Sequence, residues 1–361
     1  MLLPRGHNQT RGYGQRNDRG KRAPAGENDG RVAAHSGRGK GHRALSAAAE
    51  SGSGQHDQAR DAEHGWPRLD AGTAHPARVY DYLLGGKDNF AADRAAAEAI
   101  IEVIPSVLVT VRANRAFLRR AVRYLARDAG IRQFLDIGTG LPAAGSTHQV
   151  AQDIAPSAKV AYVDNDPVVL SHARALLKSS PAGQCAYINA DLRDAGTVMR
   201  EAAATLDLAQ PVAVLILATM QYIPDADQPH AITARLMDAV APGSFLTMSD
   251  VTADMDLQSM TAAAASYNAL LGPAVFTPRS RAEYTRFFDG LTLIEPGLVP
   301  LPQWRPDPGT GPAPNVPMYA AMGRKPSGNL TCASHAAAAT ARSRAGARNP
   351  GTAMGTVITT V

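Results

Sequence analysis

The stretch from residue 134 to residue 145, FLDIGTGLPAAG, constrains the fold more than any other part of the sequence. Its first residues are apolar, as in a short buried strand, and a glycine-rich turn and a helix are expected to follow. Gly138 and Gly140 allow the backbone to turn tightly and to approach a ligand closely, because they carry no Cβ. The free N–H groups at the start of the next helix would point toward the same ligand. The stretch therefore predicts a strand, a ligand-binding turn and a helix.

Asp136, two residues before the first glycine, distinguishes this turn from a dinucleotide-binding turn. A dinucleotide turn usually has an apolar residue there, whereas a carboxylate suits a cationic sulfonium ligand with a free amino group. The pattern apolar–Asp–apolar–Gly–x–Gly resembles the first motif of class I S-adenosylmethionine (SAM)-dependent methyltransferases. Gly138, Gly140 and Ala143 also fit G-x-G-x-x-[GA], so a nicotinamide or flavin site is the competing interpretation.

From residue 133 onward, short apolar segments alternate with helical patterns. This alternation predicts an α/β fold whose parallel sheet is covered by helices on both faces. The expected strands are residues 133–137, 159–163, 185–189, 212–217, 244–249, 291–296 and 318–323. The expected helices of this region are residues 143–154, 167–177, 228–240, 255–270 and 279–288.

Acidic residues stand at or just after the ends of four of these strands, namely Asp136, Asp164, Asp191 and Asp250. In an open α/β sheet a ligand binds outside the carboxyl ends of the strands, so these side chains are expected near one ligand. An acid at Asp164 suits ribose hydroxyls, and one at Asp191 suits the exocyclic amine of adenine. The alternative role for each is to cap the helix that follows, and this is the interpretation preferred for Asp194 and Asp225.

Two helices are expected before the first strand, over residues 91–103 and 107–127. The second has an apolar stripe, and the arginines on its other faces are interpreted as solvated. These arginines are Arg115, Arg119, Arg123 and Arg127.

The segment 77–90, ARVYDYLLGGKDNF, has two interpretations. Residues 78–84 could form a docked amphipathic helix that ends at the Gly85-Gly86 pair. Alternatively, its aromatic residues and Asn89 could form a lid that closes over a ligand on a glycine hinge.

The same segment, 77–90, resembles the N-terminal signature of an actinobacterial family of S-adenosyl methyltransferases, formerly a domain of unknown function. Residues 134–140, 242–246 and 287–291 are similar to later blocks of that family, and the resemblance covers about residues 73–326. It implies a class I methyltransferase (Rossmann-like) fold with a mostly parallel seven-stranded sheet. It also implies an N-terminal helical extension over the site, which favours the lid.

The resemblance further implies the residues that bind S-adenosyl-L-methionine. Asp136, Gly138, Thr139 and Gly140 would surround its methionine part. Asp164, with Asn165 beside it, would hold the ribose, and Asp191 and Leu192 would hold the adenine.

One position departs from the family pattern, which often has Leu-His-aromatic after the fourth strand where this chain has Met220-Gln221-Tyr222. An amide cannot act as a general base, so no catalytic residue is assigned. The candidates to line an acceptor pocket are Tyr80, Tyr82, Tyr222, His230 and Asp250. His148 and His172 are interpreted as packing or surface residues, and no metal site is predicted.

The sequence thus predicts a SAM-dependent methyltransferase that acts on an unidentified small-molecule acceptor. One alternative is a catalytically inactive SAM-binding regulatory protein, for which Gln221 is the sequence support. The other is a nicotinamide-dependent oxidoreductase, for which the glycine pattern is the support.

The pI of 9.3 reflects the two ends of the chain. Residues 1–60 carry eleven Lys and Arg against five acids, and residues 324–361 carry five against none. The 21 basic and 27 acidic residues between them argue against a nucleic-acid substrate for the core, while weak contact by the tails stays open.

The expected organisation is a disordered basic tail, a helical extension or lid, a SAM-binding domain and a second disordered tail, over residues 1–72, 73–130, 131–326 and 327–361. The first tail could instead be a nucleic-acid-binding arm, or translation could begin downstream of it. Two cysteines, the lack of an apolar N-terminal segment and the lack of a membrane-length apolar run favour the cytoplasm.

Overall fold

The computed structural model describes residues 70–176, 179–255, 257–270, 276–312 and 314–327. Its helices are α2 (Pro76–Leu84), α3 (Ala91–Val103), α4 (Val107–Arg127), α5 (Thr147–Ile154), α6 (Pro167–Leu176), α7 (Ala195–Ala202), α8 (Pro229–Asp238), α9 (Leu257–Leu270) and α10 (Arg281–Thr285). Its strands are β1 (Gln133–Ile137), β2 (Lys159–Asp164), β3 (Gln184–Asn189), β4 (Ala213–Leu217), β5 (Phe245–Val251), β6 (Thr292–Leu293), β7 (Val299–Pro300) and β8 (Met318–Arg324). The two tails expected to be disordered lie outside the described residues, except for residues 70–72 and 327.

The strands form one sheet in the order β3-β2-β1-β4-β5-β8-β6, and β7 pairs with β8 beside this path. Strands β1 to β5 are parallel, and β8 runs antiparallel to β5. The expected mostly parallel seven-stranded sheet is therefore confirmed, with the short β7 as an addition. The strand order reverses between β1 and β4, where open α/β sheets bind their ligands.

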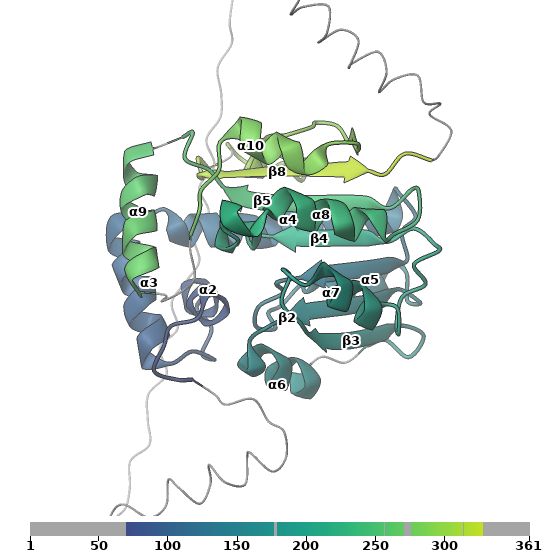
Figure 1. The fold of residues 1–361 in the computed structure, drawn as a ribbon, viewed down its shortest axis with the longest axis horizontal. Helices are drawn as coiled ribbons and strands as arrows, with labels where there is room; N and C mark the ends of the chain where they lie inside the picture. Colours follow the sequence, from purple (N-terminus) through teal and green to yellow (C-terminus); the bar gives the residue numbers. More distant parts are fainter. Residues whose placement is uncertain (1–69, 177–178, 256, 271–275, 313, 328–361) are drawn as a thin grey trace, which may run out of the picture. The chain divides into compact units, whose positions relative to one another are not determined.

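The central strands β1, β2, β4 and β5 are buried on both faces because most of their residues are apolar. Neighbouring residues of a strand point to opposite faces, so Phe134 joins one core and Leu135 the other. Helices α4 and α5 pack on the first face, and α7, α8 and α10 pack on the second (Figure 1).

The N-terminal extension is anchored to the sheet by a buried arginine. Helix α2 packs against α3 and α4, and α3 packs against α9 (Figure 1). The Arg78 Nε donates to both oxygens of Asp93 in α3, and its Nη1 lies 3.3 Å from Asp166 Oδ2 in the turn after β2. Val79 and Leu83 of α2 are buried, and Gly85 ends the helix with φ of 85°. Residues 78–84 therefore lie in a docked helix in the described structure.

Several boundaries differ from those expected. The helix expected at residue 143 begins only at Thr147, because Gly145 takes a φ of +72° and Ser146 then caps the helix. The expected helix 279–288 is shorter as α10 and continues as a 3-10 turn.

Asp194 caps α7 as expected, through the backbone N–H of Thr197. Asp225 does not cap α8, and its carboxylate instead pairs with Arg279 at 2.9 Å.

Within the described residues, none of the helices combines the length and the apolar character that a membrane span requires.

Candidate functional site

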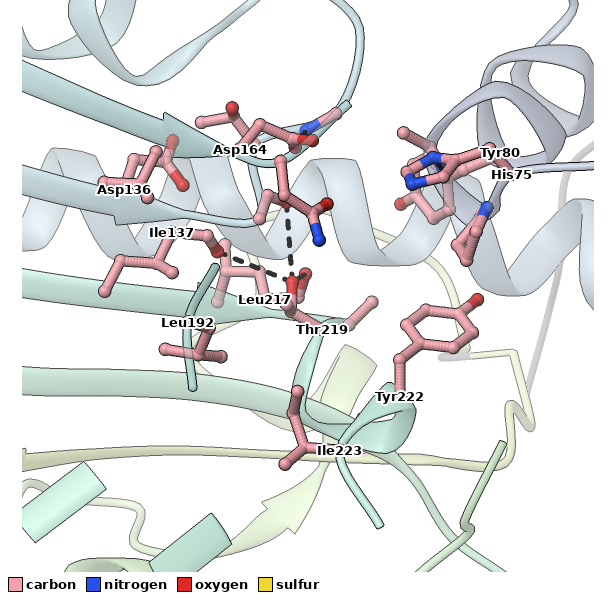
Figure 2. A pocket seen from close by; sticks show the side chains of 18 of the residues that line it. His75, Tyr80, Asp136, Ile137, Asp164, Leu192, Leu217, Thr219, Tyr222 and Ile223 are labelled. Atoms are coloured by element: carbon pink, nitrogen blue, oxygen red, sulfur yellow. Dashed lines mark hydrogen bonds between the residues drawn. The ribbon is translucent and has the colours of Figure 1, made fainter. Parts of the chain in front are cut away.

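A cavity of about 600 Å³ opens at the carboxyl ends of β1, β2 and β4 (Figure 2). All eight residues expected around the cofactor line it: Asp136, Gly138, Thr139, Gly140, Asp164, Asn165, Asp191 and Leu192. The sheet brings these residues together because each follows or ends a parallel strand, and such ends meet at one edge.

The glycine turn depends on Gly138 for two reasons. Its φ is +69°, and a Cβ there would lie 2.3 Å from Thr219 Oγ1. Its N–H donates to the Val163 carbonyl at 2.8 Å, which ties the turn to β2. Any side chain at this position would therefore be strained and would also displace Thr219.

Asp164 connects the end of β2 to the glycine turn. Its Oδ2 accepts a 2.8 Å hydrogen bond from the Gly140 N–H, and its Oδ1 accepts one of 3.0 Å from the Asp166 N–H. Burial raises the pKa of this carboxyl group, although both hydrogen bonds oppose the shift. Each oxygen keeps a free lone pair, so the carboxylate can also accept hydrogen bonds from ligand hydroxyls.

Asp136 is buried at the end of β1, where Thr147 Oγ1 donates a 2.6 Å hydrogen bond to its Oδ2. Burial raises the pKa of Asp136 to about 6, against the opposing effects of Thr147 and of the positive charge of Arg115. A cationic ligand group in the cavity would favour the ionised form.

Arg115 departs from the expectation of a solvated arginine face. It lines the cavity from α4, and its Nη2 lies 3.4 Å from the Ala144 carbonyl oxygen and 3.5 Å from that of Ala143. Asn114 and Leu118, also on α4, line the same cavity. The sequence signal was their position, since Asn114 and Arg115 precede the apolar Leu118 by about one helical turn.

Asp191 already has a cationic partner. Arg193 donates to it from its backbone N–H at 2.8 Å and from Nη1 at 3.2 Å, and also binds Asp227 through Nε at 2.6 Å. Asp191, Leu192 and Arg193 line the cavity together, so this end combines a charged rim with an apolar side chain.

Tyr80 and Tyr222 line the side of the cavity opposite Asp136, together with His75 (Figure 2). Tyr80 donates to the Val111 carbonyl at 3.2 Å and accepts from Asn114 Nδ2 at 3.1 Å. The Tyr222 hydroxyl lies 2.9 Å from that of Tyr267. Burial raises the pKa of Tyr222 to about 12, so this hydroxyl is neutral.

His75 caps α2 and was not singled out in the sequence as a site residue. Its Nδ1 lies 3.0 Å from Asp166 Oδ2, and its side chain is about 31% exposed. Because Asp166 also accepts from Arg78 and from the Val168 N–H, this carboxylate holds the imidazole in a fixed position at the cavity wall.

The other acceptor candidates lie outside this cavity. The Tyr82 hydroxyl donates to Glu98 at 3.0 Å, and His230 stacks on Phe287. Asp250 is buried in β5, 3.8 Å from Arg279, and burial raises its pKa to about 7.

Asn89, which was named with the expected lid, lies in the turn after α2, where its Nδ2 donates to Asp81 Oδ2 and the Gly86 carbonyl.

Gln221, at the position that departs from the family pattern, is buried in the wall behind the cavity. Its Oε1 accepts from the Val251 N–H at 3.3 Å, and its side chain is not part of the lining, which Thr219 and Tyr222 supply. His148 is also a packing residue, with Nδ1 2.8 Å from the Tyr162 hydroxyl. Among the residues that the structure describes, no group of three His, Cys, Asp or Glu side chains could hold a metal ion.

The strand order, the antiparallel β8 beside β5 and the acid-lined glycine turn define a class I methyltransferase. The chain belongs to the S-adenosyl methyltransferase family, whose profile matches residues 62–326. It is therefore a SAM-dependent methyltransferase, and the nicotinamide-dependent alternative is set aside.

Two solved structures are similar over most of the chain. A DUF574 family protein from Streptomyces avermitilis MA-4680 is 42% identical, with a TM-score of 0.69, and the match covers 72% of this chain and 100% of that one. A candidate methyltransferase from Thermobifida fusca YX is 38% identical, with a TM-score of 0.66, over 73% of this chain and 99% of that one. No curated protein matches the chain.

Proposed function

We propose that this methyltransferase binds SAM across the strand ends in the cavity and methylates a small molecule that binds on the side of α2. The observation that carries the proposal is the convergence of all eight expected cofactor residues on one cavity. Its volume of about 600 Å³ lies within the range of roughly 300–1,000 Å³ that is usual for small-molecule sites.

The methionine part of SAM is complementary to Asp136 and Arg115. It carries an ammonium and a carboxylate group, and the cavity offers a buried carboxylate near a guanidinium. We assign the ammonium group to Asp136 and the carboxylate group to Arg115. The Arg115 contacts to the carbonyls of Ala143 and Ala144, at 3.5 and 3.4 Å, are long enough to leave donors for a ligand.

The nucleoside part fits the other acids. Asp164 has free lone pairs for ribose hydroxyls, and Asn165 beside it adds an amide. Asp191 would accept from the adenine amine, while Leu192 offers apolar contact to the ring.

The protein itself contributes to the reaction by positioning the acceptor and by shielding the reacting groups from water. When bound, SAM supplies a methyl carbon that its positive sulfur makes electrophilic. The turn after β1 and the wall from α2 would hold the acceptor in line with that carbon and keep water away. No residue needs to act as a base if the acceptor is already nucleophilic.

Calorimetric titration with SAM, S-adenosylhomocysteine (SAH) and NADH tests the cofactor site. Binding of SAM and SAH without binding of NADH is expected. A protein that binds neither sulfur compound would contradict the proposal.

The remaining assignments belong to the same proposal. Among the described residues, those that line the cavity lie between 73 and 223, so removal of residues 1–69 is expected to leave SAM affinity unchanged. The extension, residues 73–130, would act as a fixed wall over the domain formed by residues 131–326.

We place the enzyme in the cytoplasm, for which the low cysteine content is the support.

A further inference from the structure

On the side of the cavity proposed for the acceptor, Tyr80 and Tyr222 present the faces of their aromatic rings. The hydroxyl of Tyr80 is occupied by Asn114 and Val111, and that of Tyr222 by Tyr267. Since these polar atoms already have partners, what the two tyrosines present to an acceptor is aromatic surface.

The ring of Tyr222 is held rigidly. Its centroid lies 5.9 Å from that of Tyr267 and 5.9 Å from that of Phe276, and the latter two rings stack at 4.8 Å. A ring supported in this way loses little freedom when a flat ligand binds against it.

Charge is confined to the cofactor side. The ionised side chains of the lining are Arg115, Asp136, Asp164, Asp191 and Arg193, and they stand at the strand ends or at the glycine turn. Tyr80 and Tyr222 are neutral, and Arg115, whose charge reaches Tyr80, is assigned to the SAM carboxylate, so an ammonium or a carboxylate acceptor would find no free counter-ion beside the two tyrosines.

His75 is a polar side chain of this wall that keeps an atom for a ligand. Asp166 occupies its Nδ1 at 3.0 Å, which leaves Nε2 to exchange a hydrogen bond with a hydroxyl group.

We infer that the acceptor is a neutral aromatic compound that carries a hydroxyl group. Its ring packs against Tyr80 and Tyr222, and its hydroxyl binds His75. This inference rests on the proposed function, because the SAM site forms the opposite half of the cavity.

The test is calorimetric titration of the SAH-saturated protein with three probes of similar size: 2-naphthol, decahydro-2-naphthol and 2-naphthoate. 2-Naphthol is expected to bind about fivefold more tightly than the saturated alcohol, as ring–ring contact predicts, and the carboxylate most weakly. Equal affinity for the two alcohols, preference for the carboxylate, or no binding of 2-naphthol would overturn the inference. Failure of SAH itself to bind would instead contradict the proposed cofactor site.

Two substitutions, Tyr222→Leu and His75→Ala, test whether 2-naphthol binds at the proposed acceptor site, and a third serves as a control. Tyr222→Leu is expected to remove the preference for 2-naphthol over its saturated analogue and to leave SAH affinity within twofold. Tyr82→Leu is the matched control, because Tyr82 lies outside the cavity, and it should keep the preference. His75→Ala should weaken 2-naphthol binding about fivefold. Unchanged affinity in both Tyr222→Leu and His75→Ala would overturn the inference.

Discussion

The backbone N–H of Gly140 donates a 2.8 Å hydrogen bond to the Asp164 carboxylate, and this bond joins the glycine turn after β1 to the end of β2. The bond therefore fixes the part of the site expected around the methionine of SAM relative to the part expected around its ribose. The Asp164 carboxylate, which accepts this bond, would also bind the ligand.

Asp164→Ala removes this bond together with the charge-assisted bonds expected to ribose. We expect SAM affinity to fall by about 1.5–3 kcal/mol, as measured by calorimetry. Asp194→Ala is the control, because it removes an exposed helix cap outside the cavity and should leave SAM affinity unchanged. Equal affinity in Asp164→Ala and the native protein would exclude Asp164 from the site.

Gly138→Ala should abolish SAM binding. The new Cβ meets Thr219 Oγ1 at 2.3 Å in addition to the strain of a φ of +69°. Gly290→Ala separates these effects, because Gly290 has a φ of +80° and nothing within 4 Å of the added Cβ. The control should lose about 1 kcal/mol of unfolding free energy and keep its SAM affinity. Normal SAM binding by Gly138→Ala would contradict the described turn.

Arg115→Gln should weaken SAM binding by about 1.5–3 kcal/mol, because a charge-assisted contact to the carboxylate is lost. Binding of 5′-methylthioadenosine, which lacks the amino-acid part, should not change. Arg112→Gln, which alters an exposed arginine on the same helix, should affect neither ligand. An equal loss for both ligands in Arg115→Gln would show that Arg115 does not recognise the carboxylate.

SAM affinity should depend on pH below neutrality. The pKa of Asp136 is raised to about 6 by burial, and the ammonium group of SAM favours the ionised carboxylate. Affinity should therefore rise with pH through this value and be about tenfold weaker at pH 5 than at pH 7. Titrations at several pH values measure the change. Asp136→Asn should bind more weakly and with a flatter profile, and the same slope in the variant would assign the titration to another group.

Arg279→Met should be strongly destabilising. The buried guanidinium donates to the Met220 and Ile223 carbonyls and to Asp225, and it lies 3.8 Å from the buried Asp250. Its loss leaves Asp250 without a counter-charge, which typically costs about 3–5 kcal/mol. Urea denaturation measures the difference, and Arg286→Met, at an exposed position nearby, should change stability by less than about 0.5 kcal/mol.

The sequence predicted the sheet and the cofactor side of the cavity because both depend on local patterns. Apolar runs that end in Asp136, Asp164 and Asp191 specify strands and the residues at their ends. The wall from the N-terminal extension was not predictable in this way. His75 reaches the cavity through the packing of α2 against the sheet, and such packing leaves no periodic trace at a single position. For Arg115, its position one helical turn before the apolar Leu118 was the available signal.

Asp250 shows the reverse error. It ends an expected strand as the other acids do, but the structure extends β5 to Val251, so the carboxylate stays within the sheet and faces Arg279.

The Arg78 ion pairs make the helices before β1 part of the cavity wall. They fasten α2 to Asp93 and Asp166, and α2 and α4 carry His75, Tyr80 and Arg115 into the cavity. A chain that began at residue 131 would keep the parallel strands and their acids but would expose one whole side of the cavity to water. The helices before β1 and the sheet after it thus form the cavity together, and we expect that neither part transplanted alone into another protein would transfer methyltransferase activity.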